Sequence, residues 1–311
     1  MSMITVAGEA LVDVVGQGRE VPGGGPANVA LGLGRLGAEV EFATWLGADE
    51  RGQRVARHLE ASGVQLVAGG FGAARTSSAT VLLGADGQPS YAFDIEWDLP
   101  RLQRTPAWLH VGSIAAFLQP GAEKVLAAAE RTTAAGGIVS FDPNVRPALL
   151  GTRSGARARF EELAALATVV KLSDEDAAWL WPGRDTDAVL DAVIGLGAEL
   201  AVVTAGASGS VLSTASERVT VPGERAAVID TVGAGDTYTA ALLWQLTRSR
   251  PWPADSSSTG SDSSLGHLDG TALRELGRTC SIAAAITVGR RGADLPTIDD
   301  VRLASGPKAV R

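Results

Sequence analysis

The chain has 311 residues and a formal net charge of −8, and 45% of its residues are hydrophobic. This composition excludes a disordered or collagen-like chain, and the length predicts one large α/β domain or two smaller ones. A single cysteine, Cys280, excludes an internal disulfide and a cysteine-based zinc site, which fits a cytoplasmic protein. No apolar run reaches 18 residues and the net charge is acidic, so we expect no membrane span and no nucleic-acid partner.

The hydrophobic pattern alternates between strand and helix periods along most of the chain. In the first part of the chain it predicts a strand at 4–7, a helix at 27–36, a strand at 40–46, a helix that Asp49 caps and that runs to about residue 62, and a hairpin of strands 79–83 and 90–95. In the middle it predicts strands at 108–111, 137–141 and 168–172, helices at 121–135 and 154–167, and a short helix to 181 that Ser173 caps. The last part is predicted to contain a helix at 187–196, a strand at 199–204, a hairpin of 210–213 and 218–221, and helices at 235–248 and 271–288.

This alternation predicts an α/β fold with a mainly parallel central sheet that helices cover on both faces. The hairpin near residues 79–95 breaks the rhythm, so we expect it in a smaller appended sheet. Residues 251–268 are rich in Ser, Asp, Gly and Pro, and this composition predicts an exposed, flexible insertion.

The strongest motif is D-T-V-G-A-G-D at residues 230–236, which runs into an apolar helical pattern. Gly233, Ala234 and Gly235 are small, and their N–H groups would open a helix whose dipole favours an anion. Asp236 lies in the first turn, where its carboxylate can take a proton from an attacking hydroxyl. The motif indicates phosphoryl transfer; the alternative is a glycine turn in which Asp236 only complements the dipole.

A second motif, G-G-G-P-A-N, ends at Asn28. Its glycines let a polar ligand lie against the backbone, and Asn28 offers a donor and an acceptor for a sugar hydroxyl. A flexible turn with Asn28 buried by its own helix is the alternative. Asp13 follows the first strand, where open α/β sheets bind ligands; taken as a single residue, it is better explained as a solvated loop aspartate.

The sequence Gly32-Leu-Gly34-Arg-Leu-Gly37 fits the dinucleotide pattern G-x-G-x-x-G. It lies within and at the end of a predicted helix and does not follow a strand. We therefore interpret these glycines as packing positions and reject a dinucleotide site. The chain also contains no P-loop sequence.

Together these segments resemble the ribokinase-like (PfkB) family of carbohydrate kinases. Residues 23–28, with L-G at 36–37 and W-L-G-A-D-E-R-G at 45–52, resemble the N-terminal signature of the family, and residues 230–236 resemble its C-terminal signature. The resemblance covers nearly the whole chain. It implies one kinase domain over residues 1–311, with lid segments at about 10–22 and 75–105 that form a small β-sheet over the sugar.

The resemblance also implies the roles of individual residues. Asp236 would be the catalytic base, and Gly233, Ala234 and Gly235 the anion hole. The other implied contacts are Asp13, Gly24, Gly25 and Asn28 for the sugar, then Lys171, Ser173, Thr204, Gly206, Gly209 and Gly235 for ATP, and finally Asp230 with the carbonyls of Val232, Thr287, Arg290 and Gly292 for a monovalent cation such as K⁺.

One position departs from the family pattern. Members often carry Asn-x-x-Glu near the phosphates and Mg²⁺, whereas this chain has Ser173-Asp-Glu-Asp176. Asp176 would hold Mg²⁺ through water in that alignment. A capping box formed by Ser173 and Asp176 is the other interpretation, and both can hold at once.

Within the family, residues 23–30 and F-D-P-N-V-R-P at 141–147 are most similar to fructokinases. Asp142, Asn144 and Arg146 follow a strand, where contact with a sugar or phosphate is expected; Arg146 alternatively pairs with a carboxylate to stabilise its loop. In the lid hairpin, Phe93 or Trp97 would touch the sugar, and apolar lid residues would favour a homodimer through the lids.

We therefore expect an ATP-dependent kinase that phosphorylates a primary hydroxyl of a small sugar, foremost fructose. The alternatives are a 2-keto-3-deoxygluconate kinase, a ribokinase or a nucleoside kinase of the same family. A sugar- or nucleotide-binding protein without catalysis is the alternative from another class.

Overall fold

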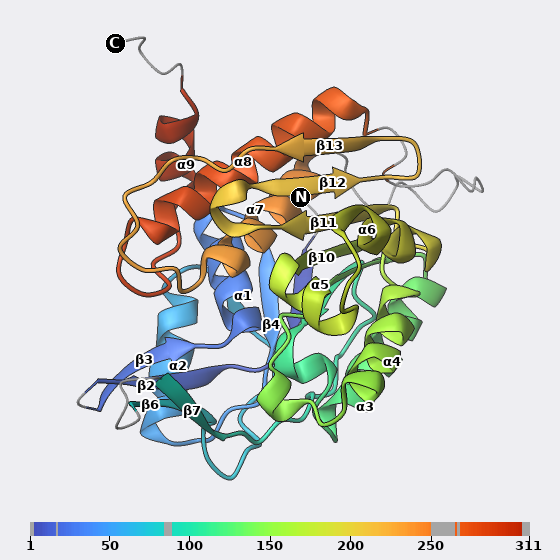
Figure 1. Cartoon of the computed structure of the whole chain (residues 1–311). Helices are drawn as coiled ribbons and strands as arrows, with labels where there is room; N and C mark the ends of the chain where they lie inside the picture. Colours follow the sequence, from blue (N-terminus) through green and yellow to red (C-terminus); the bar gives the residue numbers. More distant parts are fainter. Residues whose placement is uncertain (1–2, 17, 84–88, 250–264, 266–267, 307–311) are drawn as a thin grey trace.

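The computed structural model describes residues 3–16, 18–83, 89–249, 265 and 268–306 (Figure 1). Its described residues form a large central sheet, two layers of helices and a small separate sheet. The predicted α/β fold class is therefore confirmed.

The central sheet has the strand order β13-β12-β11-β10-β9-β8-β1-β4-β5. The strands from β11 to β5 in this order pair in parallel, and β12 and β13 add an antiparallel edge. The bounds are β1 Ile4–Ala7, β4 Val40–Ala43, β5 Gln65–Leu66, β8 Trp108–Gly112, β9 Ile138–Asp142, β10 Val169–Ser173, β11 Leu200–Thr204, β12 Ser210–Ser213 and β13 Arg218–Val221.

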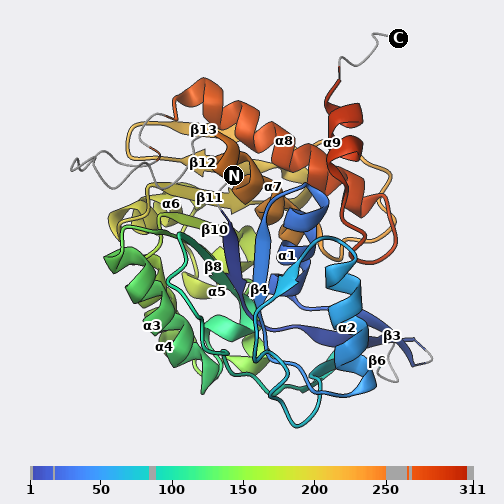
Figure 2. The ribbon, with the colours of Figure 1, turned by 180° about the vertical axis from the view of Figure 1, so that it is seen from behind.

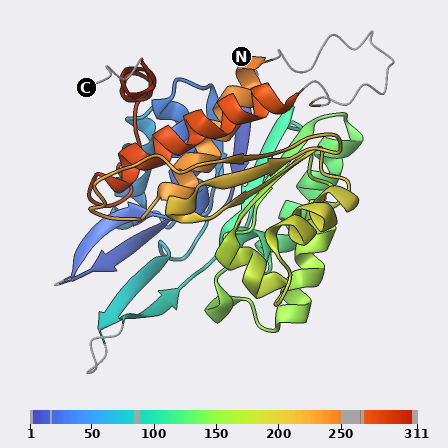
Figure 3. The same ribbon diagram turned by 45° about the horizontal axis from the view of Figure 1, so that its top comes forward.

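The small sheet projects from the body of the molecule (Figure 3). Its strand order is β3-β2-β6-β7, where β2 is Leu11–Val15, β3 Arg19–Gly23, β6 Ser78–Leu83 and β7 Pro89–Asp94. The hairpin of β6 and β7 confirms the expected appended sheet. The other two strands come from the segment directly after β1.

Helices cover both faces of the central sheet, as the views from the front and from behind show (Figures 1 and 2). One face carries α1 Gly25–Arg35, α2 Glu50–Glu60, α7 Ala234–Ser249, α8 Gly270–Val288 and α9 Ile298–Ser305, and the other carries α3 Gly121–Ala134, α4 Arg153–Ala164, α5 Asp174–Leu180 and α6 Thr186–Gly195. None of the helices in the described ranges combines the length and the apolar character needed to cross a bilayer.

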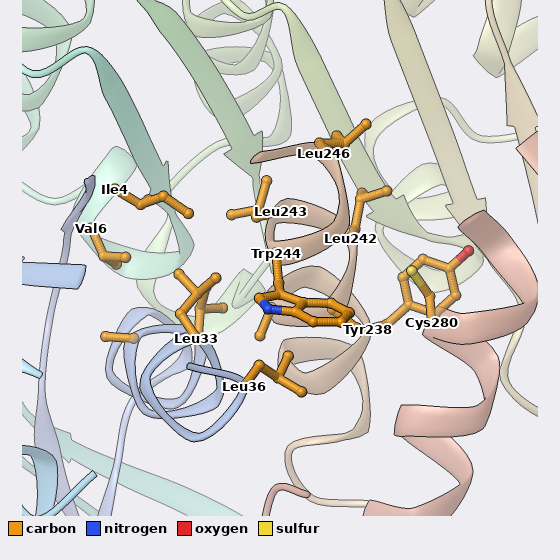
Figure 4. Packing of buried hydrophobic residues seen from close by; sticks show 14 of the residues in the cluster. Ile4, Val6, Leu33, Leu36, Tyr238, Leu242, Leu243, Trp244, Leu246 and Cys280 are labelled. Atoms are coloured by element: carbon orange, nitrogen blue, oxygen red, sulfur yellow. The ribbon is translucent and has the colours of Figure 1, made fainter. Parts of the chain in front are cut away.

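Helices α1 and α7 pack directly against each other, with Leu33, Leu36 and Trp244 between them (Figure 4). A Cβ added to Gly32 would lie 2.7 Å from the Cβ of Ala240, and one added to Gly34 would lie 2.2 Å from the carbonyl oxygen of Ser62. Both glycines therefore permit close packing of α1, as predicted for these two positions. The packing also fixes the start of α7 relative to the start of α1.

The sequence prediction was wrong in several places. The strand expected at 40–46 ends at Ala43, because the chain leaves the sheet and the Leu46 N–H bonds the Gly70 carbonyl at 2.6 Å. The hydrophobic pattern did not predict β5 or α9, nor β2 and β3, although β2 and β3 occupy the 10–22 segment that the family resemblance assigned to the small sheet. The insertion expected at 251–268 lies mostly outside the described residues; Leu265 and Leu268, which are described, are buried.

Candidate active site

The candidate site lies at the carboxyl ends of adjacent parallel strands. In the sheet register, Gly112 of β8 lies opposite Asp142 of β9, and Ser173 of β10 lies opposite Thr204 of β11. Residues that directly follow these strands are therefore brought to one edge of the sheet, where open α/β sheets bind ligands.

Asp236 lies in the first turn of α7 and is 9% exposed. Its Oδ2 accepts a hydrogen bond of 2.8 Å from Nδ2 of Asn28, which lies in the first turns of α1. The side chains of the two sequence motifs thus meet at one point. Asn28 was expected to face a sugar hydroxyl; part of its donor capacity is instead directed to Asp236.

Burial, helped by the charge of Asp142, raises the pKa of Asp236 to about 6 against the opposing effects of the Asn28 hydrogen bond and of the charges of Lys171 and Arg146. At neutral pH the carboxylate is ionised and still basic enough to receive a proton. A carboxylate with this pKa is suited to general-base catalysis near pH 7.

The N-terminus of α7 exposes backbone N–H groups beside Asp236. Gly233 has φ +80, and an added Cβ would lie 2.8 Å from the Cβ of Ala293, so this turn requires glycine. Ala234 bonds the Thr231 carbonyl at 3.3 Å. Gly235 is exposed, and among the described residues its N–H has no acceptor. An anion is the natural partner of such a group.

Beneath this turn lies a buried ion pair between Lys171 and Asp142. Lys171 Nζ is 2.9 Å from Oδ2 of Asp142, and the two side chains are 5% and 6% exposed. The Thr239 hydroxyl donates to the same oxygen at 2.7 Å. A Cβ added to Gly235 would lie 3.4 Å from Lys171 Nζ, so the ammonium group adds positive charge directly below the free N–H groups.

The Ser173 and Asp176 side chains form the expected capping box at the start of α5. Oδ2 of Asp176 accepts the Ser173 N–H at 3.0 Å, and Oδ1 accepts the Val145 N–H at 2.7 Å. Burial raises the pKa of Asp176, and the charge of Asp142 raises it further. Asp176 therefore ties the loop after β9 to the start of α5.

The sugar side of the site is built around Gly24 and Gly25. Gly24 has φ +106, and a Cβ added to Gly25 would lie 2.8 Å from Nδ2 of Asn144. Asn144 has φ 37, an uncommon conformation for a residue other than glycine. The atoms next to Gly24 and Gly25 therefore leave no room for a larger side chain at either position.

Asp13 lies within strand β2 of the small sheet, so its description as a loop residue after the first strand was wrong. Burial raises its pKa, and the charge of Arg146 opposes the rise. Arg146 is exposed and donates to the carbonyls of Asn144 and Val145 at 3.3 and 3.1 Å. Among the described residues it pairs with no carboxylate, so the alternative of a loop-stabilising ion pair was wrong.

The two aromatic residues proposed near the sugar differ in their surroundings. Phe93 lies on β7 of the small sheet and is half-buried. Trp97 is 2% exposed and donates from Nε1 to the Ala115 carbonyl at 3.1 Å. Because Trp97 is packed in the core beside α3, the expectation that it touches a ligand was wrong.

On the expected nucleotide side, Thr204 ends β11 and Gly206 begins an exposed turn with φ +49. Gly209 is buried, and an added Cβ would lie 2.1 Å from the Val221 carbonyl oxygen. Close approach of β13 explains this glycine. Its contact with ATP stays a prediction.

The residues expected around a monovalent cation come from two neighbouring loops. Asp230 Oδ1 accepts the Val232 N–H at 3.1 Å, and Oδ2 accepts the Gly292 N–H at 2.9 Å. The N–H of Ile229 bonds the Val288 carbonyl at 2.8 Å. Asp230 thus joins the loop before α7 to the loop after α8, which contains Arg290 and Gly292, while Thr287 lies in the last turn of α8.

A site for Mg²⁺ would need a carboxylate oxygen that protein donors leave free. Oδ1 of Asp142 is buried and has no hydrogen-bond partner among the described residues. No group of three or more His, Cys, Asp or Glu side chains in those residues is placed to hold a metal ion. Mg²⁺ at nucleotide sites usually has one or two protein carboxylates together with phosphates and water, so Asp142 fits that role.

Sequence reasoning missed two residues of this site, Glu9 and Ser113. Glu9 lies two residues after the end of β1, and Ser113 is the first residue after β8. The strand-end argument used for Asp142 would have found both.

A cavity of about 450 Å³ lies elsewhere, between α7, α8 and α9, and includes Trp244, Leu276 and Val301. We place the site at Asp236 because ionisable groups with raised pKa values, free N–H groups and strand ends converge there.

Comparison with known proteins agrees with this placement. The sequence profile described as pfkB family carbohydrate kinase matches residues 4–300. A fructokinase of Rhizobium leguminosarum bv. trifolii is 37% identical over 261 residues, covering 78% of this chain and 79% of that protein.

Solved structures give the same result. A fructokinase of Xylella fastidiosa with bound ATP superimposes with a TM-score of 0.82 at 27% identity and 97% coverage of both chains. A double mutant of fructokinase from Vibrio cholerae O395, with fructose, ADP and potassium bound, has a TM-score of 0.80 at 29% identity, with 97% of this chain and 98% of that chain covered.

Proposed function

This chain belongs to the pfkB family of carbohydrate kinases, and we propose that it transfers the γ-phosphate of ATP to a primary hydroxyl of fructose. The observation that carries the proposal is the position of the Asp236 carboxylate, which Asn28 holds beside the free Gly235 N–H at the start of α7. Base and anion-binding groups must be adjacent in phosphoryl transfer, because attack and charge development occur at the same phosphorus.

In the proposed reaction, Asp236 accepts the proton of the sugar hydroxyl as its oxygen attacks the γ-phosphorus. The bond to the β-phosphate oxygen breaks, and ADP leaves with that electron pair. The N–H groups of Gly233 and Gly235 and the ammonium group of Lys171 would stabilise the charge on the transferring group, whereas the Ala234 N–H, also expected in the anion hole, bonds the Thr231 carbonyl at 3.3 Å. Asp142 keeps Lys171 in place through their ion pair.

On the sugar side we assign Asp13, Gly24, Gly25, Asn28, Asn144 and Arg146. The charge of Arg146 lowers the pKa values of Glu9, Asp13 and Asp236, so its guanidinium group lies within electrostatic range of all three. Its backbone hydrogen bonds use a single nitrogen, Nη1, and the other donors suit a sugar hydroxyl or a phosphate. Phe93 would contact the sugar from the small sheet.

On the nucleotide side we assign Ser173, Thr204, Gly206 and Gly209. Asp142, and Asp176 through water, would hold Mg²⁺, which when bound offsets the charge of the nucleotide phosphates. The loops joined by Asp230 would hold K⁺ through the carbonyls of Val232, Thr287, Arg290 and Gly292. Potassium in the Vibrio cholerae fructokinase supports testing this ion first.

We further propose that the small sheet acts as a lid over the sugar. Its strand β2 carries Asp13, and its strand β7 carries Phe93, so closure would complete the sugar site. A homodimer through this sheet and a cytoplasmic location stay predictions.

The test is an ADP-release assay with fructose, ribose, 2-keto-3-deoxygluconate and a nucleoside, each with Mg²⁺ and with or without K⁺. We expect turnover with fructose and a higher rate in K⁺. Preferred turnover of another sugar would replace fructose by that substrate. Saturable binding without any turnover would instead support a binding protein.

A further inference from the structure

A carboxylate that the proposed reaction does not use lies behind the sugar side of the site. Glu9 lies two residues after the end of β1, is 2% exposed, and accepts the Ala115 N–H on Oε2 at 3.0 Å. Burial raises the pKa of Glu9 to about 7, against the opposing effects of Ser113, of the Ala115 N–H and of the charge of Arg146. Burying a carboxylate is costly unless its hydrogen bonds are well placed, so this position calls for an explanation.

The partners of Glu9 belong to a short 3₁₀ turn, Ser113–Ala116, that follows β8. Ser113 has φ 55, a left-handed conformation that residues other than glycine adopt only at a cost. A residue keeps such a backbone conformation only when contacts with neighbouring residues stabilise it. Glu9 bonds this turn at Ala115, two residues after the strained residue, and so it can hold the turn in this shape.

The turn that Glu9 holds borders the glycines of the sugar side. A Cβ added to Gly25 would lie 3.4 Å from both Cβ and Oγ of Ser113, and one added to Gly24 would lie 2.8 Å from the backbone oxygen of Glu9. Asn144 faces Gly25 from the neighbouring strand end. Glu9 therefore contacts, directly or through Ser113, the backbone on which the sugar would lie.

We propose that Glu9 is a positioning residue of the sugar site, which acts through the Ser113–Ala116 turn to set the place of Gly24 and Gly25. The inference rests on the proposed function, because it concerns the same sugar site. It predicts that loss of the Glu9 hydrogen bonds weakens sugar binding selectively, since Asp236, Lys171 and the expected nucleotide side lie on other elements.

Three variants separate positioning from a general effect on folding. E9Q keeps the size of the side chain but replaces one acceptor oxygen by an amide donor, which cannot accept from the Ala115 N–H. S113G removes the hydroxyl, while glycine adopts the same φ without strain. T132V is the matched control: Thr132 is fully buried in α3, which packs on the same turn, but within the described part of the chain its hydroxyl bonds only the Ala128 carbonyl of its own helix.

The measurement is KM for the sugar and KM for ATP, each at saturation with the other substrate, together with the thermal midpoint. We expect E9Q to raise KM for fructose by up to about 10-fold, because the buried hydrogen bond that holds the turn is weakened or lost. We expect S113G to raise it by a smaller factor. KM for ATP should change less than about 2-fold in both, and T132V should lower the thermal midpoint with neither KM changed.

A sugar KM in E9Q and S113G that equals that of T132V would overturn the proposal and leave Glu9 a purely structural residue. If E9Q does not fold, the S113G comparison decides. The assay uses whichever sugar the wild-type enzyme phosphorylates, and the Kd for fructose if it phosphorylates none. A substrate other than fructose therefore overturns the assignment of fructose without touching the inference about Glu9.

Discussion

The side-chain amide of Asn28 donates a 2.8 Å hydrogen bond to the Asp236 carboxylate, and 208 positions separate the two residues in sequence. Close packing of α1 on α7 brings them together. The hydrogen bond orients the carboxylate and stabilises its charged form in a buried place. The burial and the charges around this pair determine how replacement of either residue should change activity, its pH dependence and stability.

Replacement of Asp236 by Asn should remove the base while preserving size. We expect kcat with fructose to fall by about 10²- to 10⁴-fold, because general-base catalysis contributes about that factor. The Kd for ATP should stay within about 2-fold of wild type, since the N–H groups of α7 remain. Steady-state kinetics and calorimetric ATP titration test this; a kcat near the wild-type value would remove Asp236 from the mechanism.

Replacement of Asn28 by Ala should shift the pH profile of kcat. In the wild type we expect activity to decline as pH falls through about 6, where Asp236 takes up a proton. The Asn28 hydrogen bond lowers the pKa of Asp236, so its loss should raise that pKa and move the acidic limb to higher pH. An acidic limb that stays in place would show that Asn28 does not influence the base.

The same burial should make Asp236 costly for stability. Its pKa rises from 3.8 to about 6 on folding, so the folded protein binds more protons between these values and loses stability as pH rises through them. We expect D236N to stabilise the protein by about 1–3 kcal/mol at pH 7.5 and by much less at pH 3.5.

Urea unfolding at the two pH values measures this difference. The matched control is E39Q, because Glu39 is an exposed carboxylate and should leave the free energy of unfolding unchanged at both. A D236N protein that is less stable than wild type at pH 7.5 would contradict the expectation.

Breaking the buried ion pair of Lys171 and Asp142 should lower the stability of the protein more than breaking a surface ion pair. We expect K171M to destabilise the protein by about 3–5 kcal/mol, because it leaves a buried carboxylate without its counter-charge. The double variant D142N/K171M should recover part of the loss. K124M is the control: the exposed Lys124–Asp98 pair at 2.6 Å should contribute less than about 1 kcal/mol. Equal losses of stability in K171M and K124M would show that the buried ion pair contributes no more than the exposed one.

Replacement of Gly34 should disrupt the close packing of α1. In G34A the new Cβ would collide with the Ser62 backbone, so we expect a loss of about 1–3 kcal/mol in urea unfolding. Gly195, in the last turn of α6, has no atom within 4 Å of an added Cβ. G195A should therefore be neutral or stabilising, and a similar loss in both variants would contradict the packing role of Gly34.

The strands and helices that could be predicted are those with strong local periods. The buried parallel strands and the helices that pack on them have apolar residues at regular spacing, and Asp49 and Ser173 are N-caps as expected. Strand β3 was missed because its sequence R-E-V-P-G contains charges and a proline. Such a strand is stable only as the edge partner of β2, and that pairing is not a local property.

The sequence by itself determined the fold class, the family and the glycine-rich start of α7, because periodicity and motif spacing are properties of short segments. Only the tertiary structure decided that Asn28 holds Asp236, that Lys171 pairs with Asp142, and that Glu9 supports the turn at Ser113. Each of these depends on burial and on partners from distant parts of the chain, and the energy of a charge is set by the groups that replace its water.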